Sequence, residues 1–74
     1  MSRYHVNLHL STEQLESFYA GSVRDVSAVD IKGRRIQFPL SALRPFVSHV
    51  GVSGFFELQV TTDHRLRSIR RIDH

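Results

Sequence analysis

Arginine is the residue type in this sequence with the clearest capacity to bind a ligand. The last ten residues hold four arginines against one aspartate, whereas the residues before them balance six basic against six acidic side chains. A guanidinium donates two parallel hydrogen bonds to a phosphate or carboxylate, so this basic end favours a polyanionic partner. The alternative is a solvated face without a partner. The predicted anion-binding residues are Arg34, Arg35, Arg65, Arg67, Arg70 and Arg71.

The five histidines do not predict a metal site. His5 and His9 fall on one face of a predicted strand, but four residues of strand span roughly 13 Å. A zinc–nitrogen bond measures about 2.0–2.1 Å, so this pair cannot hold a single ion. Exposure to solvent is the commoner explanation for the other histidines. We therefore expect no metal and no other cofactor.

Catalytic motifs in the sequence are incomplete or missing. Gly51-Val52-Ser53-Gly54 is one residue short of the nucleophile elbow Gly-x-Ser-x-Gly, and there is no cysteine nucleophile. Glu13 and Glu16 are explained by a helix start, and Asp25 and Asp30 by a solvent-facing strand. We therefore predict that the protein is not an enzyme.

Two adjacent aromatic residues, Phe55 and Phe56, suggest a second kind of binding surface. Neighbouring strand residues point to opposite faces, so both rings cannot enter the same core. An uncovered ring could meet a protein partner or stack on an unpaired base, although aromatics in so small a fold mostly serve burial. The alternative to polyanion binding is therefore protein interaction or self-association through Phe46, Phe55 and an exposed sheet edge.

Three segments are distinctive enough to compare with known families. Residues 33–39, 42–47 and 54–58 read Gly-Arg-Arg-Ile-Gln-Phe-Pro, Ala-Leu-Arg-Pro-Phe-Val and Gly-Phe-Phe-Glu-Leu. Together with Tyr19 and Gly21, they resemble a family of short uncharacterised bacterial proteins catalogued as a domain of unknown function. The most specific part is the pair Ile-Gln-Phe-Pro and Leu-Arg-Pro-Phe. The resemblance implies a free-standing bacterial cytosolic protein, and it transfers no activity, ligand or catalytic residue.

The elements that position these residues follow from hydrophobic patterning. Apolar residues alternate with polar ones over residues 4–10, which predicts a strand. Ser11 and Gln14 form a capping box that starts a helix of about ten residues. Its predicted inner face carries Leu15, Phe18 and Tyr19, and the left-handed Gly21 is expected to end it.

The rest of the chain predicts four more strands. Residues 23–31 form the second, with Val29 and Ile31 on one face and Asp30 on the other, and a turn leads to the third at residues 35–38. A capped turn over residues 41–45 precedes the fourth strand at residues 55–60. Beyond residue 64, apolar residues recur every three positions, which favours a bulged strand with the bulge near Ser68.

We therefore predict one α+β domain over residues 1–74. It is a small curled antiparallel sheet or partly open barrel of about five strands, with one N-terminal helix between strands 1 and 2. The lack of cysteine and of an apolar run favours a cytoplasmic protein without a membrane segment. So small a core leaves ligands to the surface or to a subunit interface. We expect a binding module for nucleic acid, an acidic protein or another polyanion, and homo-oligomerisation is possible.

Overall fold

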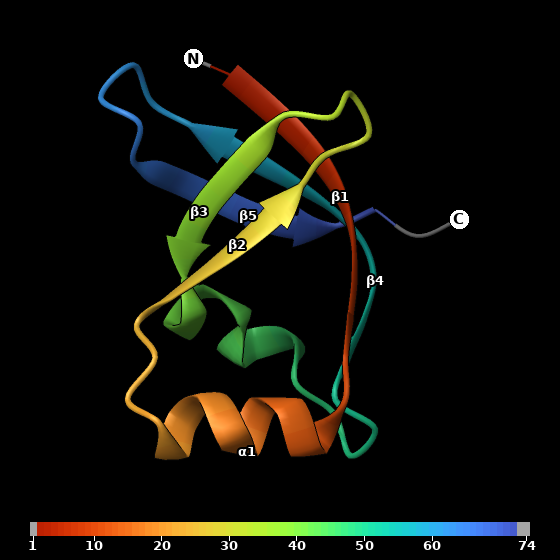
Figure 1. Cartoon of the computed structure of the whole chain (residues 1–74). Coiled ribbons are helices and arrows are strands. Elements are labelled where there is room, and N and C mark those ends of the chain that lie inside the picture. Colours follow the sequence, from red (N-terminus) through yellow and green to blue (C-terminus); the bar gives the residue numbers. More distant parts are fainter. Residues whose placement is uncertain (1, 73–74) are drawn as a thin grey trace.

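Five strands and two helices are arranged as two antiparallel sheets in the computed structural model, which describes residues 2–72. The central strand of the larger sheet is β4, flanked by β1 and β5, and β2 pairs with β3 in the smaller sheet (Figure 1). The predicted α+β class, with one α-helix between the first two strands, is confirmed. In chain order the elements are β1 (Ser2–Leu10), α1 (Thr12–Ala20), β2 (Asp25–Val29), β3 (Arg35–Pro39), the 3₁₀ helix η1 (Leu40–Phe46), β4 (Val52–Val60) and β5 (Leu66–Arg71).

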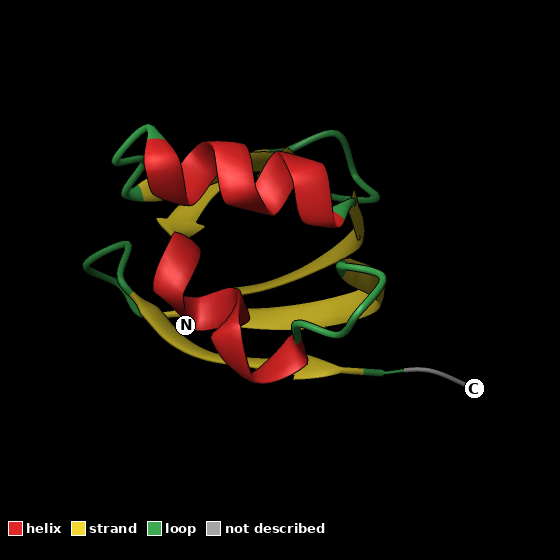
Figure 2. Ribbon diagram, turned by 90° about the horizontal axis from the view of Figure 1, so that it is seen from below, coloured by secondary structure: helices red, strands yellow, loops and turns green. Residues whose placement is uncertain are grey.

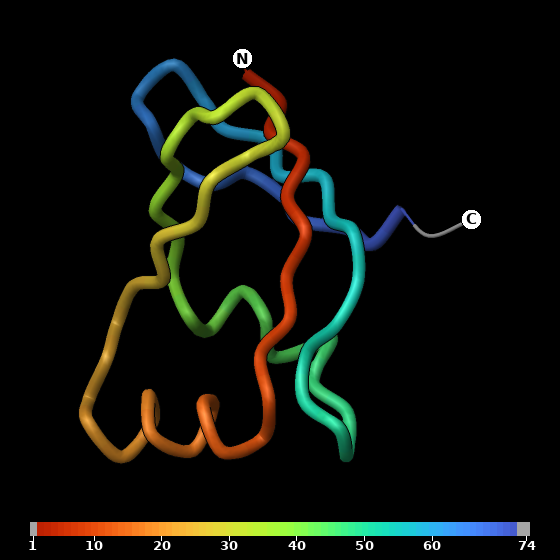
Figure 3. Tube along the Cα trace, turned by 45° about the vertical axis from the view of Figure 1, so that its right-hand side comes forward, coloured from red at the N-terminus to blue at the C-terminus, as the bar shows by residue number. Residues whose placement is uncertain are grey.

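The smaller sheet is attached to the larger one beside β1. The Ile31 amide, just after β2, donates to the His5 carbonyl of β1 at 2.9 Å. Figure 3 shows the turn between β2 and β3 lying next to β1. On its other side, β3 has no strand partner among residues 2–72, and β5 pairs only with β4. The assembly is therefore a partly open barrel whose open side lies between β3 and β5.

The core fills the space between the two sheets and the helices. Inward-facing residues alternate along each strand, so that Val6 of β1 lies opposite Phe56 of β4 and both are fully buried. Both helices lie at one end, as the view from below in Figure 2 shows, and Leu43 of η1 reaches the core. The buried apolar residues are Val6, Leu8, Leu15, Val26, Ile36, Phe38, Leu40, Leu43, Val52, Phe56, Leu58 and Val60.

The predicted capping box of α1 is confirmed. The Gln14 amide donates to Ser11 Oγ at 3.1 Å, and the Ser11 amide donates to Gln14 Oε1 at 2.9 Å. The prediction for Tyr19 is wrong, because this side chain is 45% exposed. Gly21 is not left-handed either, since its φ is −84°. The left-handed residue is Ser22, with φ of 60°.

The predicted orientation of the second strand is wrong at its end. β2 stops at Val29, and Val29 and Ile31 are 58% and 63% exposed. Asp30, expected on a solvent-facing strand, is 5% exposed. Its carboxylate turns inward because Oδ1 accepts from the amides of Lys32 (3.1 Å) and Arg34 (2.7 Å) and thereby closes the hairpin turn.

The final segment is the predicted bulged strand. Ser68 lies opposite Gln59 and Leu66 opposite Val60, which leaves Arg67 as the extra residue. The bulge brings Leu66 and Ile69 onto the same side, where both pack against the core. The predicted turn at residues 41–45 is part of η1, and no side chain caps it. Within residues 2–72, neither helix has the length and hydrophobicity needed to span a membrane.

Candidate functional site

The six predicted arginines are distributed over separate parts of the molecule. Arg34 lies in the β2–β3 turn, and Arg67 stands at the bulge of β5. Arg35 and Arg65 line a groove beside β3. Arg70 contacts Glu57 on the outer side of the larger sheet, whereas Arg71 lies over the core ring of Phe56 at 5.4 Å and donates to the Ser53 carbonyl. Only some of the predicted set can therefore meet one ligand.

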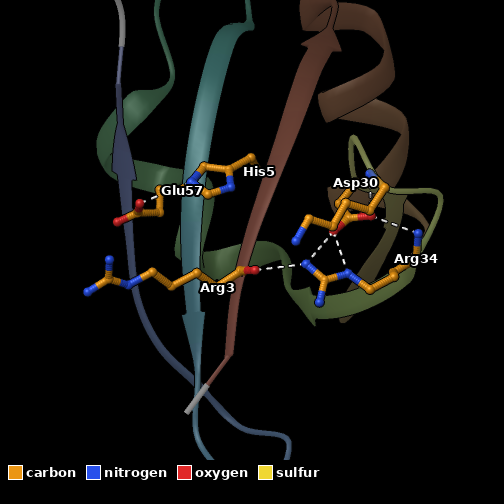
Figure 4. Close-up of polar contacts among 6 residues, drawn as sticks. Arg3, His5, Asp30, Arg34 and Glu57 are labelled. Atoms are coloured by element: carbon orange, nitrogen blue, oxygen red, sulfur yellow. Dashed lines mark hydrogen bonds and ion pairs between the residues drawn. The ribbon is translucent and has the colours of Figure 1, made fainter.

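Arg34 links the two sheets. Its Nε and Nη2 each lie 2.8 Å from Asp30 Oδ2, and Nη2 also donates to the Arg3 carbonyl at 2.9 Å (Figure 4). The guanidinium lies over the Tyr4 ring, 4.3 Å from its centroid. Burial raises the pKa of Asp30, but the hydrogen bonds from Arg34 and Lys32 outweigh it and hold that pKa below its usual value. Arg34 thus acts within the fold.

The outer face of the larger sheet carries polar and aromatic side chains. These are the residues that alternate with the core residues along β1, β4 and β5. In Figure 4, which looks onto this face, no helix ribbon passes in front of the strands. We define the outer face by Arg3, His5, Asn7, His9, Ser53, Phe55, Glu57, Gln59, Ser68 and Arg70.

Glu57 lies at the centre of the outer face and holds two of its neighbours. Its Oε2 lies 3.1 Å from His5 Nε2, and its Oε1 accepts from Arg70 Nε at 3.2 Å. The hydrogen bond with His5 lowers the pKa of Glu57 most strongly, and the charges of Arg70 and Arg3 lower it further against the effect of burial. The Glu57 side chain is 8% exposed and that of Arg70 is 68% exposed. The carboxylate is therefore occupied, while the guanidinium remains accessible.

Phe55 and Phe56 take opposite faces, as their adjacency predicts. Phe56 is fully buried, and Phe46 packs edge-on against it with ring centroids 5.1 Å apart. Phe46 therefore contributes to the core rather than to an open surface. Phe55 is half-buried on the outer face, where its ring stacks on His5 with centroids 6.0 Å apart and an angle of 18°. Of the two predicted interaction residues, Phe55 is the one placed on an uncovered face.

A groove of about 630 Å³ follows the open side of the barrel. One wall is formed by all five residues of β3, and the other includes His64, Arg65 and Leu66 of the β4–β5 hairpin. Asp25 also lines it, and its Oδ2 accepts from Gln37 Nε2 at 3.3 Å. Arg35 and Arg65 were predicted from the sequence as binding residues, but the groove itself was not, because its walls lie far apart along the chain.

A possible catalytic pair, His9 and Ser53, also lies on the outer face. His9 Nδ1 is 3.0 Å from Ser53 Oγ, but both residues are exposed. A working pair of this kind needs a third group that orients the histidine, and the described residues provide no further hydrogen bond to His9. Over residues 2–72, His, Asp and Glu side chains also do not gather in threes that could hold a metal.

The chain matches the model of a family described as protein of unknown function (DUF2835) over residues 2–72, and it belongs to this family. The predicted likeness to a family of unknown function is thereby confirmed. No curated protein and no solved structure matches the chain.

Proposed function

We propose that this protein binds single-stranded nucleic acid on the outer face of the larger sheet. The observation that carries the proposal is the stacked pair of Phe55 and His5, with Arg3 and Arg70 beside it, on a sheet face that no helix covers. Unpaired bases stack on aromatic rings, and guanidinium groups bind phosphates.

The spacing of the outer face suits one extended strand of nucleic acid. Successive side chains on one face of a strand lie about 7 Å apart, and three strands span about 10 Å. His5 and Arg70 therefore lie in one row of side chains that runs across the three strands. Arg3 lies in the next row on one side of it, and Phe55 lies in the next row on the other side. Ring and guanidinium groups at this spacing can contact neighbouring nucleotides.

The charge of the outer face supports the same partner. Within the defined set, Arg3 and Arg70 stand against Glu57, which gives two positive charges and one negative with neutral histidines. Glu57 is nearly buried and already engaged by His5 and Arg70, so it repels a phosphate less than an exposed carboxylate would. It also holds the His5 ring and the Arg70 guanidinium in place.

A single strand fits this surface better than a duplex. Reading a duplex commonly requires a basic helix or ribbon that enters a groove. The α1 segment contains two glutamates and no lysine or arginine, and its ribbon does not cross the outer face in Figure 4. An open sheet face with a stacking ring is the arrangement used for unpaired bases.

Fluorescence anisotropy with a labelled oligonucleotide of about twelve nucleotides tests the proposal. We expect binding that weakens with rising salt, and a duplex of equal length to bind more weakly. Phe55→Ala should weaken binding about fivefold or more, since stacking contributes about 1–3 kcal/mol per base. Arg70→Gln should reduce the slope of log affinity against log salt by about 0.7, the value for one phosphate contact of a single strand.

The matched control is Arg65→Gln, which removes an equal charge from the groove. It should leave both affinity and salt slope nearly unchanged. Lack of binding at low salt, or equal loss in Arg65→Gln and Arg70→Gln, would exclude the outer face as the binding surface.

A further inference from the structure

We infer that the groove beside β3 binds an extended acidic segment of a partner protein as an additional β-strand. The groove shares no residue with the outer face, so this inference is independent of nucleic-acid binding.

The backbone of β3 presents unused hydrogen-bonding groups to the groove. At the two ends of the hairpin, the Leu40 amide donates to the Arg24 carbonyl and the Asp30 amide to the Arg34 carbonyl, both at 2.8 Å. In an antiparallel pair, bonded positions alternate, so Ile36 and Phe38 bond toward β2. The backbone groups of Arg35, Gln37 and Pro39 therefore point the other way.

This edge can hold a strand of a partner. Arg35 and Gln37 each offer one N–H and one C=O, and Pro39 offers only its C=O. Because the whole of β3 lines the groove, an added strand would lie within it. Main-chain bonds of this type supply affinity without regard to sequence, so selectivity must come from side chains.

The side chains of the groove select for an acidic, alternating segment. Arg35 and Arg65 have no carboxylate within ion-pair distance among residues 2–72, and the Asp25 carboxylate is engaged by Gln37. Ile36 and Leu66 contribute apolar surface to the same groove. Since alternate residues of a strand point to opposite sides, the fitting segment alternates apolar with acidic residues.

A second copy of this chain is a poorer match for the same edge. Antiparallel pairing of two β3 strands centred on Gln37 would set each Pro39 opposite an Arg35 and leave that position one hydrogen bond short. It would also bring the basic rims of two grooves together. Charge complementarity therefore favours an acidic partner segment.

The test uses an eight-residue peptide that alternates glutamate and valine, with binding followed by amide chemical shifts of the protein. We expect shifts confined to β3 and the β4–β5 turn. The combined variant Arg35→Gln with Arg65→Gln should bind about tenfold more weakly, whereas Arg70→Gln should bind as the wild type does. The double variant should also retain oligonucleotide binding, which separates failure here from failure of the proposed function.

Three matched peptides make the test decisive. A peptide with lysine in place of glutamate should not bind, and N-methylation of one alternate set of amides should abolish binding while methylation of the other set preserves it. Equal binding of the lysine peptide, or no effect of either methylation, would overturn the inference. Light scattering that shows concentration-dependent dimers, with shifts at β3 in the absence of peptide, would overturn it in favour of a second copy.

Discussion

At the scale of single residues, the carboxylates of Asp30 and Glu57 decide how neighbouring basic groups are used. Asp30 accepts hydrogen bonds from two backbone amides and from the Arg34 guanidinium, and Glu57 engages His5 and Arg70. The Arg34 guanidinium is thereby used in contacts within the fold, whereas the Arg70 guanidinium stays exposed on the outer face. Hydrophobic alternation does not distinguish a paired carboxylate from a solvated one, which explains why the prediction for Asp30 was wrong.

We expect the free energy of unfolding to decrease as the pH falls below about 4. The folded-state pKa values of both carboxyl groups lie below their usual values. Each group therefore stabilises the fold above its unfolded-state pKa, about 3.9 for Asp and 4.3 for Glu, and this contribution is lost as the pH falls through the folded-state pKa. Urea unfolding between pH 7 and pH 3 measures this loss.

Glu57→Gln should flatten that acid dependence, because the variant has no carboxylate to protonate at this position. Glu16→Gln removes an exposed carboxylate from α1 and serves as the control with wild-type dependence. If the free energy of unfolding of both variants falls with pH as steeply as that of the wild type, hydrogen bonding of Glu57 is not a source of the acid sensitivity.

At the scale of elements, local signals located most elements but not all of their bounds. β1 and β4 end at Leu10 and Val60 as predicted, whereas β4 starts at Val52, three residues before the predicted start at residue 55. Alternation identified β1, β3 and β4, and the capping box located the start of α1. The end of β2 was placed wrongly, at Ile31 instead of Val29, because side-chain hydrogen bonds of Asp30 rather than any periodic pattern decide where the strand gives way to the turn. The bulge in β5 was predictable, since three-residue spacing of Leu66 and Ile69 fits one side of a strand only with an extra residue.

Gly51→Ala should be among the most damaging single changes. Gly51 has φ of 103°, and a Cβ there would lie 2.0 Å from the Leu10 carbonyl oxygen at the β1–α1 junction. We expect a loss of more than about 4 kcal/mol in unfolding free energy, or failure to fold, as for other severe backbone clashes.

Gly33→Ala is the matched control for this clash. Gly33 also has a positive φ, 81°, but nothing lies within 4 Å of the added Cβ. Its cost should be the backbone strain alone, about 1–2 kcal/mol. Equal losses in the two variants by thermal or urea unfolding would show that the contact with Leu10 is unimportant.

The helix η1 stabilises the fold through Leu43. This side chain is fully buried in the core cluster, and truncating such a leucine typically costs about 2–5 kcal/mol. Leu43→Ala should therefore lower the free energy of unfolding by about 3 kcal/mol in urea titration. Arg44→Ala, at the neighbouring exposed position, should change it by less than about 0.5 kcal/mol. A Leu43→Ala variant as stable as Arg44→Ala would mean that η1 does not anchor the core.

At the scale of the whole molecule, the binding surfaces depend on contacts that the sequence does not reveal. Arg70 and Phe55 were predicted from the sequence as binding residues, whereas Arg3 and His5 were not. The His5–Glu57 contact joins residues 52 positions apart, and only the antiparallel pairing of β1 with β4 brings them together. Long-range pairing of this kind has no local pattern, so a charge count could indicate a polyanion partner without locating its surface.

The two sheets also differ in how firmly they are held. The larger sheet has a central strand that is paired on both sides. The smaller sheet is hydrogen-bonded to β1 through the Ile31 amide and the Arg34 guanidinium. On its other side, the smaller sheet borders the groove. Arg34 therefore helps to hold the smaller sheet, and with it the free edge of β3, against β1.

Arg34→Lys tests this role, because lysine keeps the charge but lacks the planar fork that contacts Asp30 and the Arg3 carbonyl together. Hydrogen exchange should accelerate on the order of tenfold at the amides of Ile31 and Gly33, while exchange in β4 stays as in the wild type. Arg35→Lys, one residue further along, is the control and should exchange as the wild type does. Uniform acceleration of hydrogen exchange across both sheets would instead mean that Arg34 stabilises the fold as a whole and not the smaller sheet in particular.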